Sequence, residues 1–118
     1  MAAMSREAAS EPDRVRVVVV DDDDAMRLLL RLQFELDGRF DVVGEAADGQ
    51  AAIDLAEALQ PDLVVLALHM PGLSVVDAIP EIRRRATESA VMLYTLKTGD
   101  GTYQAALAAG ALDRKSVV

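Results

Sequence analysis

The sequence contains no cysteine and a single histidine, and aromatic residues make up only 3% of it. The lack of cysteine excludes disulfides, thiol nucleophiles and cysteine-based metal sites, and one histidine cannot build a histidine-rich metal site. With so few aromatic side chains, the core has to consist of Val, Leu, Ile, Ala and Met. No apolar run reaches the roughly 18 residues of a transmembrane helix, so we expect no membrane-spanning segment.

Basic residues are also few: 12 Lys and Arg stand against 20 Asp and Glu, which gives a net charge of −8. This charge favours solubility and argues against DNA or an anionic membrane as a direct partner. The 118 residues, of which 52% are hydrophobic, suffice for one domain with a real core. The N-terminus is rich in Ala, Ser and Glu and lacks the apolar segment of a signal peptide. We therefore expect a flexible tail over residues 1–13, one domain over residues 14–118, and a cytoplasmic protein.

Apolar runs and helical periodicities alternate along the chain. The runs predict strands at residues 15–20, 40–46, 63–68, 90–94 and 112–118. The periodic segments predict helices at residues 25–36, 50–59, around 76–82 and at 102–109. Alternation with short connections predicts βαβ units, right-handed crossovers and a parallel sheet with helices on both faces.

Local signals predict where these helices begin and end. We expect Asp24 to cap the first helix and Gly38 to end it. Pro80 is expected near the first turn of the third helix, where a missing N–H costs least. The first helix has a wide apolar arc and only a narrow polar side. The arc consists of Ala25, Met26, Leu28, Leu29, Leu30, Leu32, Phe34 and Leu36.

The chemistry-bearing residues fall at the ends of the predicted strands, where open parallel sheets bind their ligands. Asp21 and Asp22 follow the first strand directly, and two adjacent carboxylates suit Mg²⁺, which would neutralise phosphate charge during transfer. Thr95 follows the fourth strand and could hydrogen-bond a phosphoryl oxygen. A carboxylate at the end of the third strand would be the nucleophile of such a site. That position holds Ala67, whose methyl group can neither accept a phosphoryl group nor bind a cation.

Taken together, these segments give the chain a family resemblance. The segments that carry it are residues 19–23 with Arg27, the Gly-Glu-Ala-Ala-Asp-Gly run at 44–49, residues 61–66, the Met-Pro-Gly motif at 70–72, Thr95, and residues 109–111. Over about residues 14–118 the chain resembles the receiver domain of two-component response regulators. The run at 44–49 is most similar to receivers attached to LuxR-type helix-turn-helix domains. The resemblance implies a flavodoxin-like α/β fold, with a doubly wound parallel sheet of five strands in the order 2-1-3-4-5.

The resemblance assigns roles residue by residue. Asp21 and Asp22 match the metal-binding acids of the family, and Thr95 matches its switch Thr or Ser. Ala67 falls on the phosphoacceptor Asp. His69 falls where a backbone carbonyl ligates the metal, a role that does not depend on the side chain.

Several neighbouring positions depart from the family pattern. Val75 stands where a Gly is usual, and Leu96 replaces the small residue that follows the switch Thr. Val117 occupies the Lys position, with Lys115 two residues earlier, and Arg114 occupies the aromatic switch position. We therefore expect a vestigial Mg²⁺ site of low affinity and no other cofactor. Both natural degeneration and an engineered or artefactual change at the acceptor position are compatible with these residues.

Receivers normally finish with a fifth helix packed beside the first, and this sequence stops at Val118. On that basis we expect the final helix to be lacking and an apolar surface on the sheet and the first helix to be uncovered. A second copy of the chain, an exchanged element or a partner would then cover it. The alternative is a truncated chain of marginal stability.

The function expected from these residues is that of an atypical receiver without enzymatic activity. It would act in a two-component phosphorelay by protein–protein contact with a sensor kinase or an output protein, as a dimer, without phosphorylation at the usual site. One alternative is a true phosphotransfer receiver that uses a non-standard acceptor, for which His69 could serve and, in principle, Asp77, although Asp77 lies outside the strand-end geometry. Another is a receiver-like sensor whose former acidic pocket holds a small molecule.

Overall fold

The computed structural model describes residues 13–68, 70 and 72–94. In this part of the chain, strands and helices alternate as predicted. The elements are β1 Val15–Val20, α2 Asp24–Asp37, β2 Phe40–Ala46, α3 Gly49–Leu59, β3 Leu63–Ala67, α4 Val75–Arg85 and β4 Ala90–Tyr94. The helix predicted at residues 102–109, the strand predicted at 112–118 and nearly all of the predicted tail lie outside the described residues.

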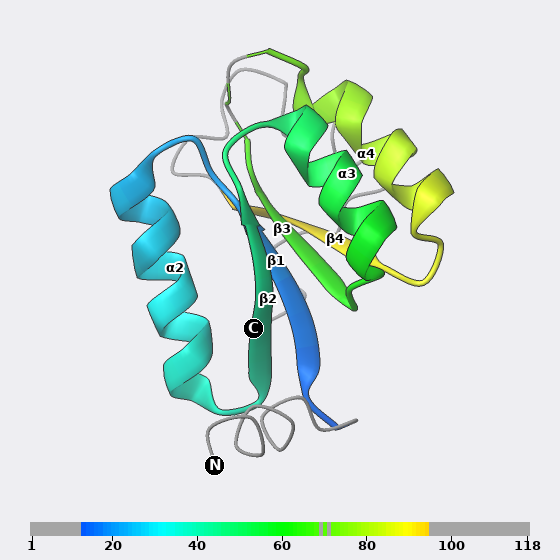
Figure 1. The fold of residues 1–118 in the computed structure, drawn as a ribbon. Helices are drawn as coiled ribbons and strands as arrows, with labels where there is room; N and C mark the ends of the chain where they lie inside the picture. Colours follow the sequence, from blue (N-terminus) through cyan, green and yellow to red (C-terminus); the bar gives the residue numbers. More distant parts are fainter. Residues whose placement is uncertain (1–12, 69, 71, 95–118) are drawn as a thin grey trace.

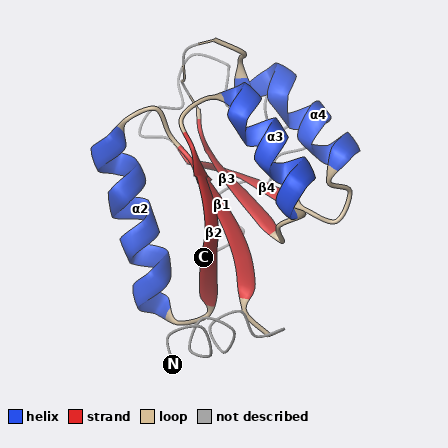
Figure 2. Ribbon diagram, viewed as in Figure 1, coloured by secondary structure: helices blue, strands red, loops and turns tan. Residues whose placement is uncertain are grey.

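The strands form one parallel sheet in the order β2-β1-β3-β4. Helix α2 covers one face of this sheet, and α3 and α4 cover the other (Figure 1). Figure 2 shows the same three layers, with the strands between the helices. The α/β architecture and the strand order as far as β4 are therefore confirmed. Within the described ranges, no helix combines the length and the hydropathy that crossing a membrane requires.

The core has two parts because the central strands are buried on both faces. Alternate residues of β1 point to opposite sides: Val18 and Val20 pack with α3 and α4, whereas Val17 and Val19 pack on the side of α2. All residues of β3 are buried as well. Burial on both faces explains why β1 and β3 read as unbroken apolar runs rather than as alternating patterns.

The helix ends differ in detail from the expectation. Asp23, and not Asp24, caps α2, because its Oδ1 accepts the N–H groups of Ala25 at 2.9 Å and Met26 at 3.2 Å. Asp24 is the first residue of the helix and pairs with Arg27 instead. Gly38 ends α2 with a φ of 87°, as predicted.

Pro80 lies further into its helix than expected. Helix α4 starts at Val75, behind the capping Ser74, so Pro80 falls in the second turn rather than the first. Proline has no N–H, and the carbonyl of Val76 therefore lacks its usual partner within the helix. Pro80 is exposed, so this carbonyl lies on the solvent side of α4.

Gly49 sets the distance between α3 and the loop that follows β3. A Cβ at this position would lie 2.9 Å from the carbonyl oxygen of Leu73, and only glycine permits so close an approach. The side chain of Asp48 caps α3 next to this contact by accepting the N–H of Ala51 at 2.8 Å. The loop after β3 is thereby held against the N-terminus of α3, beside the carboxyl end of the sheet.

Candidate functional site

The carboxyl edge of the sheet brings the acidic pair and Ala67 together. Val20 of β1 pairs with Leu66 of β3, so the residues that follow them, Asp21 and Ala67, are neighbours at this edge. Ala67 is only 7% exposed and pairs in turn with Tyr94 of β4. The structure therefore places the methyl group where the sequence suggested that an acid was missing.

Asp21 is the buried member of the acidic pair, with 5% of its surface exposed, whereas Asp22 is exposed. Burial raises the pKa of the Asp21 carboxyl, although the N–H of Asp23, which donates to its Oδ1 at 2.9 Å, opposes this rise. The negative charges of Asp22 and Asp23 raise the same pKa further. The end of β1 thus concentrates negative charge that a cation would relieve.

The donor set fits Mg²⁺ only in part. Mg²⁺ prefers oxygen ligands and is often held by one or two carboxylates with several retained waters, which the pair Asp21 and Asp22 can supply. Among the described residues, no group of three acidic or histidine side chains comes together at one point. Ala67 contributes no ligand, so the pair on its own suits a hydrated ion bound with low affinity.

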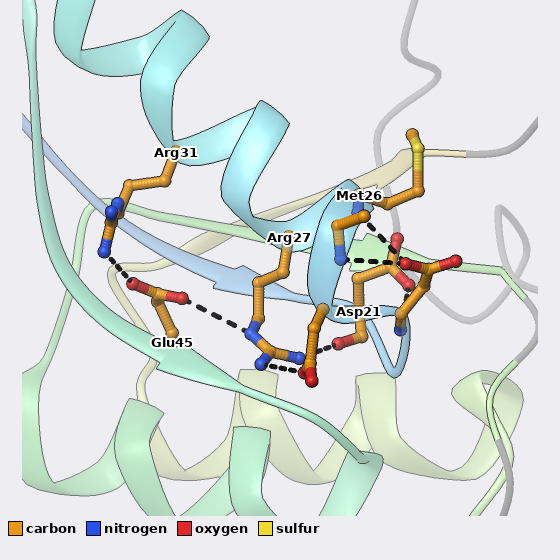
Figure 3. Close-up of polar contacts among 8 residues, drawn as sticks. Asp21, Met26, Arg27, Arg31 and Glu45 are labelled. Atoms are coloured by element: carbon orange, nitrogen blue, oxygen red, sulfur yellow. Dashed lines mark hydrogen bonds and ion pairs between the residues drawn. The ribbon is translucent and has the colours of Figure 1, made fainter.

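Arg27 connects this edge to two other elements. Its Nη1 donates to the main-chain carbonyl of Asp21 at 2.6 Å, and its Nη2 donates to the carboxylate of Asp24 at 2.5 Å. Its Nε donates to Glu45 of β2 at 3.3 Å, so each nitrogen of the guanidinium has a different partner (Figure 3). The sequence indicated Arg27 only as part of the family resemblance, and its one local signal was the position three residues after Asp24.

Glu45 also receives a second arginine from α2. Arg31 Nη1 donates to its Oε2 at 2.9 Å, whereas Arg31 Nε is buried and has no hydrogen-bond partner. Figure 3 shows both arginines reaching from α2 toward Glu45, with only Arg27 extending to Asp21. The sequence does not reveal this network, since both arginines lie in α2 and Glu45 lies in β2.

The other predicted site residues divide into two groups. Val75 and Asp77 are described. Val75 begins α4 and is 2% exposed, in the core that α4 forms with the sheet. Asp77 is exposed in the first turn of α4, where its Oδ2 accepts the hydroxyl of Ser74 at 3.2 Å. The remainder lie outside the described residues, and they are His69, Thr95, Leu96, Arg114, Lys115 and Val117. The roles expected for these remaining residues stay predictions.

A second candidate site is the outer face of α2. Its exposed leucines are Leu28, Leu29, Leu32 and Leu36, with exposed fractions of 45%, 47%, 42% and 86%. Only Leu30 of this helix is buried, and Phe34 is half-buried on the same inner side. The wide apolar arc predicted from the sequence therefore serves the core with one part and faces solvent with the other.

These exposed side chains follow a defined spacing. Ala25, Leu29, Leu32 and Leu36 recur at alternating steps of four and three residues, which is the spacing of a coiled-coil seam. We call these four residues with Leu28 the α2 seam. Beside α2, a groove of about 260 Å³ lies over the same face of the sheet. Its lining consists of Leu30, Gln33, Phe34, Asp37, Phe40 and Met92.

Comparison with known proteins shows the family to which the chain is similar. The family described as the response regulator receiver domain matches residues 17–114. The nitrate/nitrite response regulator protein NarP of Escherichia coli is 38% identical over 96 residues, which are 81% of this chain and 45% of NarP. A protein-glutamate methylesterase/protein-glutamine glutaminase of Geobacter sulfurreducens is 37% identical over 102 residues, 85% of this chain and 28% of the relative.

Solved structures show the same similarity in three dimensions. The signal receiver domain of the response regulator NarL from Mycobacterium tuberculosis matches with a TM-score of 0.81 and 32% identity, covering 90% of this chain and 94% of that one. The response regulator domain of Thermotoga maritima CheB matches with a TM-score of 0.77 and 32% identity, over 85% of this chain and 75% of that one. The chain spans about a quarter to a half of the length of the curated relatives that it matches.

Proposed function

Because the chain belongs to the response regulator receiver domain family, we propose that it is an atypical receiver that signals by protein–protein contact without phosphorylation at the usual site. The observation that carries this proposal is Ala67 at the end of β3, next to Asp21. A carboxylate there would form an acyl phosphate, and a methyl group has no atom that can attack phosphorus. The chain would then contribute its surfaces rather than a phosphotransfer step.

The acidic pair gives this receiver a weak Mg²⁺ site formed by Asp21 and Asp22. When bound, Mg²⁺ would neutralise the charge that accumulates at the end of β1. Asp21 is already oriented by the N–H of Asp23, and Asp22 faces solvent, where the ion would keep most of its waters. Thr95 is proposed as a remnant of the family's switch.

The α2 seam is the proposed contact surface for a protein partner. Its spacing suits a helix packed alongside α2, because side chains at such positions interlock with those of a facing helix. A helix of a sensor kinase, a helix of an output protein or α2 of a second copy would supply this geometry. A homodimer through the seam would bury Leu28, Leu29, Leu32 and Leu36 from both copies.

Incubation with acetyl phosphate and Mg²⁺, followed by intact mass measurement, tests the proposal. The wild-type chain should keep its mass, whereas Ala67→Asp is the matched variant that regains an acceptor. A phosphate on the wild type would overturn the proposal and favour a non-standard acceptor. If neither protein gains phosphate, the loss of phosphotransfer extends beyond Ala67 to the rest of the pocket, and the proposal stands.

A further inference from the structure

The position of Arg27 is unfavourable unless its partners hold it there. It lies in the first turn of α2, where the helix dipole is positive and disfavours a cation. Its side chain is only 17% exposed, so water does little to compensate. Hydrogen bonds to Asp24 and Glu45 raise the pKa of Arg27, against the effect of burial, and keep the guanidinium charged.

The contact with Asp21 is of a different kind from the two ion pairs. Nη1 donates to the main-chain carbonyl of Asp21, which belongs to the peptide group that joins Asp21 to Asp22. The N–H of Asp21 is fixed as well, since it donates to the carbonyl of Ala46 at 3.1 Å. The peptide groups on both sides of the Asp21 side chain are therefore held, one by β2 and the other by Arg27.

We propose that Arg27 is a positioning residue that fixes the direction of the acidic pair by tying the carbonyl of Asp21 to Asp24 of α2 and Glu45 of β2. The planar guanidinium holds three partners in three directions at once, which a lysine ammonium on a flexible stem does not reproduce. Any effect on Mg²⁺ rests on the proposed weak site at Asp21 and Asp22. The effect on the turn itself does not depend on a metal.

Arg31 offers a matched comparison on the same helix. It shares Glu45 with Arg27 but makes no hydrogen bond to Asp21. Arg31→Lys and Arg27→Lys both keep the charge and both disturb the contact with Glu45. Only Arg27→Lys removes the guanidinium group that reaches the turn. The difference between the two variants therefore separates the positioning of the acidic pair from the effect of charge.

The test compares the full chain with Arg27→Lys and Arg31→Lys by NMR. In Arg27→Lys, amide exchange at Asp23, whose N–H donates to Asp21 Oδ1, should accelerate about tenfold, as expected for the loss of one hydrogen bond in the turn. Mg²⁺ titration should show about tenfold weaker binding, since residues that orient a metal ligand commonly have effects of this size. Arg31→Lys should stay within about twofold of the wild type in both measurements.

The outcomes separate the two proposals. Unchanged Asp23 exchange in Arg27→Lys, or equal changes in both variants, would overturn the role of Arg27. If the wild type binds no Mg²⁺, the weak metal site is wrong, and exchange at Asp23 alone decides the role of Arg27. Exchange at Ala86, whose N–H donates to Ile82 in α4, reports general loss of stability and should not change in either variant.

Discussion

Replacement of Gly49 by alanine tests whether the loop after β3 is held against α3 as tightly as the structure indicates. The added Cβ would lie 2.9 Å from the carbonyl oxygen of Leu73 and 3.4 Å from the Leu73 Cβ. Real Cβ atoms essentially never approach a non-bonded heavy atom within 3.0 Å, so the first distance is a clash. The clashing atom belongs to the main chain and cannot move by a simple change of rotamer.

The size of the effect follows from two opposing contributions. Overpacking of this kind typically costs about 1–3 kcal/mol, and the higher helix propensity of alanine returns less than about 1 kcal/mol in a first turn. We therefore expect Gly49→Ala to lower the free energy of unfolding by about 1–2 kcal/mol. For a domain of this size, the melting temperature should fall by about 5 °C.

Gly44→Ala is the matched control in β2. Its Cβ would lie 3.0 Å from Leu59 Cδ1, the flexible end of a half-buried side chain that can give way. Urea unfolding followed by circular dichroism should show a change of less than about 0.5 kcal/mol for Gly44→Ala, because alanine also restricts the unfolded chain. If Gly49→Ala were no more destabilising than Gly44→Ala, the close approach of α3 and the loop would be wrong.

Three further perturbations probe the acidic edge, α4 and the α2 seam. Asp21→Asn should be more stable than the wild type in urea at pH 7, because burial raises the pKa of Asp21 and its charge opposes folding. That advantage should disappear as the pH falls below the ordinary carboxyl range, where the carboxyl is protonated in both the folded and the unfolded state. An advantage that persists there would contradict the raised pKa of Asp21. Pro80→Ala should raise the free energy of unfolding by about 1–2 kcal/mol, since it restores a donor to the carbonyl of Val76, and a loss of stability would argue against the observed helix. Leu32→Glu should abolish any self-association detected by light scattering at tens of micromolar, and a dimer that survives it would not use the α2 seam.

Most of the fold could be predicted from local patterns. Burial on both faces produces unbroken apolar runs, so β1 and β3 were recognisable, and Gly38 marked the end of α2. The neighbouring positions of Asp21 and Ala67 followed from the rule that parallel strands end at the same edge. Local patterns predict well those features that depend on adjacent residues in the sequence or on the periodicity of apolar residues.

The network around Glu45 could not be predicted in the same way. Arg27 and Arg31 belong to α2 and Glu45 belongs to β2, and only the packing of α2 against β2 brings them together. The cap of α2 was misassigned by one residue because four consecutive aspartates offer equivalent capping groups. The backbone conformation selects Asp23, whose φ of −88° and ψ of 116° are extended, and the sequence carries no signal for that choice.

We propose that this receiver signals without phosphate at the end of β3. Phosphorus NMR at neutral pH, recorded after incubation with acetyl phosphate and Mg²⁺, tests it most directly because it also detects phosphate on histidine, which acid would release. The wild type should give no protein-bound phosphorus signal. A protein-bound signal, whether an acyl phosphate or a phosphohistidine, would contradict the proposal.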